Sequence, residues 1–79
     1  MLSFELIGKQ TGELPNELEV FLDQDGLETL IAQLRFLQDG KSDHIHLMSE
    51  SWGGSELCNK TQVSGNLPIH HVKFLLRHP

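Results

Sequence analysis

The stretch DGLETLIAQLRFLQDG, residues 25–40, decides the fold of this chain because its apolar residues follow the period of an α-helix. Asp25 and Glu28 have the spacing of a capping box at the start of such a helix. Gly40 can take the left-handed backbone conformation that ends one. The pattern predicts a helix of about 14 residues. Its apolar stripe consists of Leu27, Leu30, Ile31, Leu34 and Leu37, which recur at steps of three and four.

Residues on both sides of this helix alternate between apolar and polar types, which is the period of a half-buried strand. Residues 3–8 and 17–22 alternate before the helix, and the turn between them contains Gly12 and Pro15. Two such segments joined by a short polar turn predict an antiparallel hairpin. After the helix, the predicted strands are 44–48, 56–60 and 70–76, separated by turns at 51–55 and 64–68. The order ββαβββ predicts an α+β fold with one helix packed on one face of an antiparallel sheet.

Length, composition and charge restrict the class of protein. A length of 79 residues predicts a single domain, residues 1–79. Apolar residues make up 38% of the chain and charged residues 22%, which indicates a globular domain rather than a disordered one. Eleven acidic residues against 6 basic ones give a net charge of −5, so we expect no nucleic-acid partner. The acidic balance suits a basic protein surface instead.

Cys58 is the single cysteine of the sequence, which excludes an internal disulfide and fits a reducing cytoplasm. No apolar segment approaches the ~18 residues that span a bilayer, and residues 1–5 lack the features of a signal peptide. We therefore expect a cytoplasmic protein with no membrane partner. Glu56 shares a predicted strand face with Cys58, but the sequence places no base beside the thiol. We expect Cys58 to serve as a small apolar residue and the chain not to be an enzyme.

Two histidines, His44 and His46, lie two residues apart in a predicted strand and therefore project from the same face. Together with His70 and His71 of the last strand, they are candidate ligands for a zinc or nickel ion. The H-x-H spacing is unspecific, and no C-x-x-C or H-E-x-x-H motif accompanies it. We expect no cofactor, and a metal-binding accessory or enzyme domain is the alternative interpretation.

Trp52 lies in a glycine-rich turn, where it can either anchor a partner or pack over the sheet. The predicted partner contacts are Trp52, Glu50, Glu56, His44 and His46. The sheet face opposite the helix would also carry Met48, and a second copy of the chain can cover a face of this kind. A homodimer of housekeeping role is therefore a further alternative.

Two motifs carry a resemblance to a known family: D-H-x-H-L-M at residues 43–48 and W-G-G-x-E-L at residues 52–57. Together with G-L-E, L-I and L in the helix portion 26–34, they make residues 18–76 similar to the immunity protein family numbered thirty-two of bacterial polymorphic-toxin systems. The resemblance implies a small α+β protein that neutralises a secreted toxin in the cell that produces it. It implies no catalytic residues.

The resemblance and the composition together predict a non-catalytic immunity protein whose partner is a cognate protein toxin. Many toxin domains that act on nucleic acids are basic, and association with a partner of net charge −5 would then be electrostatically steered.

Overall fold

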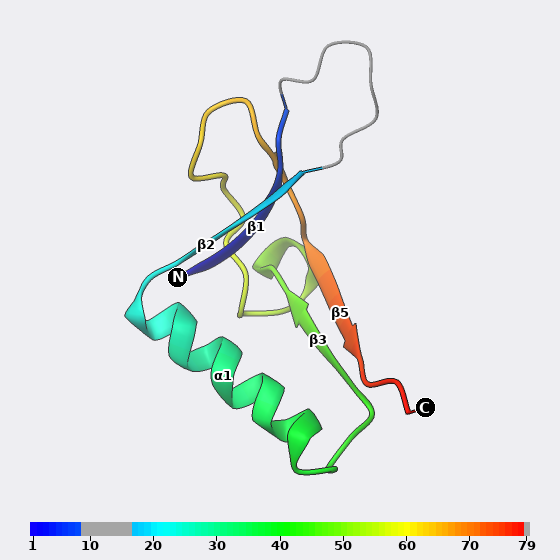
Figure 1. Cartoon of the computed structure of the whole chain (residues 1–79). Helices are drawn as coiled ribbons and strands as arrows, with labels where there is room; N and C mark the ends of the chain where they lie inside the picture. Colours follow the sequence, from blue (N-terminus) through cyan, green and yellow to red (C-terminus); the bar gives the residue numbers. More distant parts are fainter. Residues whose placement is uncertain (9–16, 79) are drawn as a thin grey trace.

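The computed structural model describes residues 1–8 and 17–78 (Figure 1). Within them the elements are β1 (Leu2–Leu6), β2 (Leu18–Leu22), α1 (Gln24–Gln38), β3 (His44–Met48), the short 3₁₀ helix η1 (Glu50–Trp52), β4 (Leu67–Pro68) and β5 (His71–Leu75). The predicted α+β class and the order ββαβββ are confirmed. The predicted turn with Gly12 and Pro15 lies outside the described residues.

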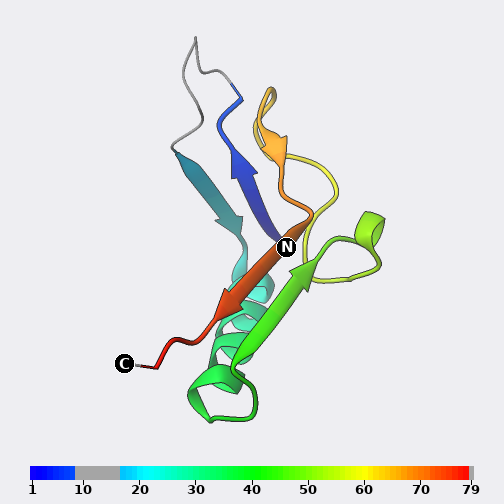
Figure 2. The same ribbon diagram turned by 90° about the vertical axis from the view of Figure 1, so that its right-hand side faces the viewer.

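The described strands form two antiparallel sheets, with the orders β2-β1-β4 and β3-β5. A bend at Ile69 and His70 separates β4 from β5 and carries the chain from one sheet to the other (Figure 2). Both sheets hold this bend: the Ile69 N–H donates to the Phe4 carbonyl at 2.8 Å, and the Ser49 N–H donates to the His70 carbonyl at 3.0 Å. The two sheets therefore meet at a fixed place next to the end of β3.

Strand β1 is buried on both faces because an element lies over each of them. Leu2 and Phe4 face the apolar core, in which Leu47 of β3 also lies. On the opposite face, Ser3 and Glu5 are buried beneath the segment that leads to β4. The Glu5 carboxylate is fully buried, and its hydrogen-bond donors are the Ser3 hydroxyl at 2.6 Å, the Gln62 N–H at 2.8 Å and the Asn66 amide at 3.0 Å.

Helix α1 begins two residues earlier than the predicted capping box, so the prediction of Asp25 as the cap is wrong. The N-cap is Asp23, whose carboxylate accepts the Gly26 N–H at 2.8 Å and also binds the N-terminal ammonium of Met1. Gly26 is required at this point because a Cβ there would overlap the Met1 carbonyl. Helix α1 ends at Gln38 with Asp39 as its C-cap, and Gly40 follows with the predicted positive φ, of 76°.

Helix α1 packs against β3 and against the end of β2. In the predicted apolar stripe, Leu37 is buried and Leu30 packs on the core, whereas Ile31 and Leu34 remain exposed. The stripe is therefore wider than the surface that the two sheets cover. Figure 2 shows α1 behind β3 and β5, on one face of that pair.

The predicted strand at 56–60 is wrong. Leu57 makes only an isolated parallel bridge with Ser49, and the N–H groups of Glu56 and Leu57 both donate to the Met48 carbonyl. The Cys58 N–H then donates to the Leu2 carbonyl at 2.9 Å, so the chain leaves β3 for the other sheet. The predicted turn at 51–55 includes the last two residues of η1 and then Gly53, which has a φ of 88°. The predicted turn at 64–68 is wrong at its end, because Leu67 and Pro68 pair with β1 as strand β4.

Candidate functional site

The pairing of β3 with β5 determines which side chains share the outer face, the one turned away from α1. Ile45 and Leu47 are buried on the inner face. The outer face carries the residue pairs His44–Leu75, His46–Lys73 and Met48–His71, because residues directly opposite one another in antiparallel strands point the same way. The prediction that His44 and His46 share an exposed face is confirmed.

Five aromatic rings follow one another near this face, and we call them the ring row: His44, His46, His71, Trp52 and His70. The ring centroids of His44 and His46 are 5.1 Å apart, and those of His46 and His71 are 5.0 Å apart. Trp52 lies 6.2 Å from His71 and 6.2 Å from His70, with its plane only 8° from that of His70. The Trp52 side chain is 59% exposed, so a partner has access to it.

His46 and His71 form the centre of the ring row. The His46 Nδ1 and His71 Nε2 atoms share a hydrogen bond of 2.8 Å. The ring planes differ by 21°. With 2.8 Å between the two nitrogens, the ring centroids are farthest apart when both rings point directly at each other, and the observed 5.0 Å is close to that maximum. The two rings therefore meet edge to edge, with the nitrogen lone-pair directions facing each other and one proton between them. Loss of solvent, with repulsion from His71, His44 and Lys73, lowers the pKa of His46 below 6.5.

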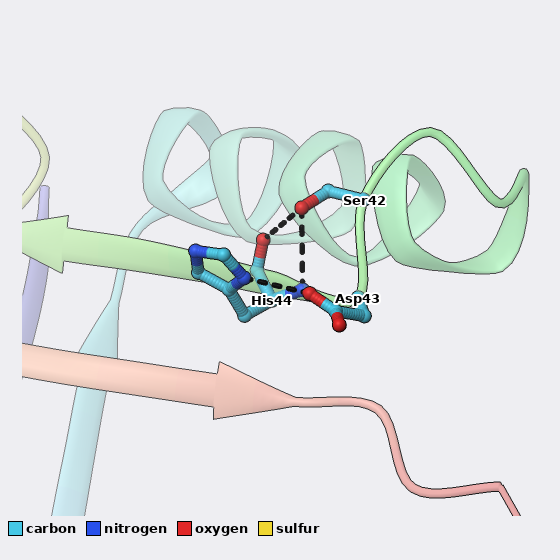
Figure 3. Close-up of polar contacts among 3 residues, drawn as sticks. All are labelled: Ser42, Asp43 and His44. Carbon is cyan, nitrogen blue, oxygen red and sulfur yellow. Dashed lines mark hydrogen bonds and ion pairs between the residues drawn. The ribbon is translucent and has the colours of Figure 1, made fainter.

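His44 is oriented by its neighbours at the start of β3 (Figure 3). Its Nδ1 atom lies 2.8 Å from an oxygen of Asp43. The Ser42 hydroxyl donates to the His44 carbonyl at 2.8 Å and accepts the His44 N–H at 3.3 Å. The hydrogen bond to His44 and the charge of that ring lower the pKa of Asp43 below 3.8. The carboxylate is thus ionised at neutral pH and holds the ring of His44 in place.

Ser49 is a member of the site that the sequence reasoning missed. Its hydroxyl shares a hydrogen bond of 2.7 Å with Nδ1 of His70, which fixes the ring on which Trp52 lies. A serine beside an imidazole can be a nucleophile with its base. Here the Ser49 side chain is fully buried, so a substrate cannot reach it. Its role is to hold the His70 ring, on which Trp52 stacks. The pairing of β3 with β5 was needed to find it, because 21 residues separate the two partners.

The two predicted glutamates lie beside the ring row rather than in it. Glu50 is exposed in η1, two residues before Trp52. Glu56 is half-buried and accepts the N–H and the hydroxyl of its neighbour Ser55 at 2.7 and 3.2 Å. Glu50 and Glu56 both line an open hollow of about 440 Å³, together with Met1, the start of β1 at Leu2, and other residues between 55 and 62. The structure therefore brings together Trp52, His44 and His46 and places the two carboxylates at an adjacent hollow.

The geometry does not favour the metal alternative. In the described part of the chain, no three histidine, cysteine or carboxylate side chains converge where they could hold a metal ion. The short distance between His46 and His71 leaves room for a proton but not for a metal ion between their nitrogens. The hydrogen bonds of the described residues also join no histidine ring to Cys58, which is half-buried. The site offers ring faces, ring nitrogens and nearby carboxylates to a partner.

Comparison with known proteins gives no match: no protein family, no curated protein and no solved structure is similar to this chain. Over residues 1–8 and 17–78, there is no helix of the length and apolar character needed to cross a membrane.

Proposed function

We propose that the protein is a non-catalytic immunity protein that binds a cognate bacterial toxin and neutralises it in the cytoplasm of the producing cell. The observation that carries this proposal is the ring row, which offers a continuous aromatic surface on the outer face of β3 and β5. Aromatic rings, and tryptophan above all, contribute a large share of the binding energy at protein interfaces.

The placement of the two sequence motifs supports the proposal. Residues 43–48 form β3 and the residue before it, and residues 52–57 contain the end of η1 and the chain that follows. The motifs supply three rings of the ring row, His44, His46 and Trp52. They also supply the buried core residues Leu47 and Leu57, so the same short segments build the core and the exposed surface.

The charge of the chain supports a basic partner. The net charge is −5, and Glu50 lies exposed two residues from Trp52. A cationic side chain of the partner can therefore lie over the Trp52 ring while its charge interacts with a carboxylate. The long-range attraction between an acidic and a basic protein also raises the association rate.

Co-expression tests the proposal. The C-terminal domain of the large protein encoded next to this gene is expressed with and without this chain, and bacterial growth is followed. We expect that domain to arrest growth alone, and growth to recover when the chain is present and co-purifies with it. Toxicity that persists with soluble chain present, or rescue without a complex, would contradict the proposal.

A further inference from the structure

Strand β2 presents an apolar face that the rest of the described chain leaves open. Leu18, Val20 and Leu22 are 50%, 42% and 37% exposed. They lie on the core side of the sheet, because they are paired with Leu6, Phe4 and Leu2 of β1. The core covers only part of this side, since α1 reaches no further than the end of β2. Large apolar side chains in a contiguous exposed group are typical of an interaction surface.

Two more observations make β2 a site of association. Among the described strands, β2 pairs with β1 alone, so it forms the edge of its sheet and its outer backbone groups are free to pair with another strand. An apolar groove of about 450 Å³ also adjoins Leu18, and its other lining residues are Phe4, Leu6, Ile69, His71, Val72 and Phe74. A strand added at β2 would extend the apolar side of the sheet.

We propose that a second copy of this chain pairs with β2, strand β2 against strand β2, in antiparallel orientation about a twofold axis at Val20. In this register Leu18 lies opposite Leu22 of the second copy, and Val20 lies opposite Val20. The twofold axis is perpendicular to the sheet, so the apolar face of one β2 continues into the apolar face of the other. The sheet β2-β1-β4 then becomes one sheet of six strands.

The order of the apolar residues in β2 selects this register over its neighbours. Pairing centred on Glu19 would put two carboxylates directly opposite each other, and pairing centred on Phe21 would put Leu18 opposite Gln24, outside the apolar contact. Pairing centred on Val20 puts Glu19 opposite Phe21, and the Glu19 carboxylate is already bound to the Asn66 amide at 3.1 Å. At the strand ends Glu17 lies opposite Asp23, whose charge is compensated by the N-terminal ammonium. Among these three registers, only the central one places Leu18, Val20 and Leu22 all opposite apolar residues, so it is the favoured one.

This interface is separate from the one proposed for the toxin. The ring row lies on the sheet β3-β5, whereas the second copy pairs with the edge of β2. His71 belongs to the ring row and also lines the groove beside Leu18, but it takes no part in the pairing of the two β2 strands. The isolated chain can therefore form a dimer whether or not it neutralises a toxin, and each proposal can fail alone.

The oligomeric state of the purified chain tests the inference. We expect light scattering after gel filtration to show a dimer that dissociates on dilution. Val20→Lys is expected to give a monomer at all concentrations. Val63→Lys is the matched control, since Val63 is the same residue type with the same 42% exposure, and it is expected to keep the dimer. A wild-type chain that is monomeric at every concentration, or a folded Val20→Lys variant that still dimerises, would overturn the inference.

Cross-linking tests the register and remains decisive if Val20→Lys does not fold. In a Cys58→Ala background, a cysteine introduced by Val20→Cys lies at the twofold axis, where the two copies of the residue face each other. Mild oxidation is expected to give a covalent dimer, and Val63→Cys under the same conditions is expected to stay monomeric. A Val20→Cys chain that forms no more covalent dimer than Val63→Cys would refute β2 pairing.

Discussion

At the scale of single residues, the hydrogen bond between His46 and His71 makes the outer face sensitive to acid. The bond needs one ring nitrogen that carries a proton and one that does not, so protonation of both rings breaks it. Lys73 lies opposite His46 and His44 lies beside it, and no carboxylate contacts His46 among the residues that the structure describes. A positive charge added to His46 or His71 is therefore repelled by the neighbouring groups and is not compensated by a carboxylate.

The lowered pKa of His46 gives a stability prediction with a definite sign. Between its lowered pKa and 6.5, the unfolded chain binds more protons at this residue than the folded chain does. The free energy of unfolding should therefore fall as the pH is reduced from above 6.5 through the folded-state pKa. Urea unfolding at about pH 7.5 and pH 5.5 measures this fall. We expect a smaller fall for His46→Gln and an unchanged one for His78→Gln, and equal falls in all three chains would contradict the account.

Glu5 is the second residue whose environment can be tested directly. Burial raises the pKa of this carboxyl, but hydrogen bonds from Ser3, Gln62 and Asn66 outweigh burial and lower it below 4.5. Glu5→Gln replaces one accepting oxygen with a donor that faces other donors, so it should cost about 1–3 kcal/mol of unfolding free energy at neutral pH. A carboxyl group whose pKa is lower in the folded chain than in the unfolded chain stabilises the fold at pH values above the unfolded-state pKa. This stabilisation is lost as the pH falls below about 4.5.

Unfolding in urea at several pH values checks the Glu5 prediction. The variant is expected to lose part of the acid dependence below about pH 4.5 as well as stability at neutral pH. Glu17→Gln, at an exposed carboxylate, should leave both quantities near those of the natural sequence. The account of the buried network fails if Glu5→Gln is as stable as Glu17→Gln.

At the scale of elements, the structure gives different roles to Asp23 and Asp25, two aspartates near the start of α1 that are equally plausible helix caps in the sequence. Asp23 caps the helix and binds the N-terminal ammonium, whereas Asp25 lies in the first turn. Asp23→Ala should therefore lower the urea midpoint clearly, and Asp25→Ala should change it little. Because both substitutions remove one charge, a comparison of the two midpoints gives the combined contribution of the cap and the contact with the N-terminal ammonium. An equal loss in both variants would show that the helix begins elsewhere.

Local patterns in the sequence predict the elements that depend on local physics. The three- and four-residue steps of leucine predict α1, the positive φ available to Gly40 predicts its end, and alternation predicts β1, β2 and β3. The choice of Asp25 as the cap fails because Asp23 is held by Met1, which is distant in sequence. The capping hydrogen bond joins residues that are close in the sequence, but here a contact with the distant residue Met1 determines which aspartate caps the helix.

Strand pairing is the part that alternation cannot predict. Residues 56–60 alternate well enough for a strand, but β3 pairs with β5 and the N–H groups of Glu56 and Leu57 converge on one Met48 carbonyl. The same long-range pairing builds the ring row. The sequence places His44 and His46 on one face, but only the register puts His71 opposite Met48 and Ser49 beside His70.

At the scale of the whole molecule, the described chain exposes more large apolar residues than it buries. Six apolar side chains form the buried core, and twelve large ones are exposed. A core this small is common in chains of this length, which often gain stability from association. Two groups of these exposed residues have distinct locations: Trp52 in the ring row, and Leu18, Val20 and Leu22 on β2. We propose that the first group contacts the toxin and that the second contacts a second copy of the chain.

The affinity of the purified toxin domain for three versions of this chain tests the central claim most directly. The versions are the natural sequence, Trp52→Ala and Val63→Ala, and titration calorimetry gives the dissociation constant of each. We predict that Trp52→Ala weakens binding by about 2 kcal/mol or more, which is about 30-fold, while the fold is retained. Val63→Ala should bind as the natural sequence does. A folded Trp52→Ala variant that binds as tightly as Val63→Ala would contradict the assignment of the ring row as the binding surface.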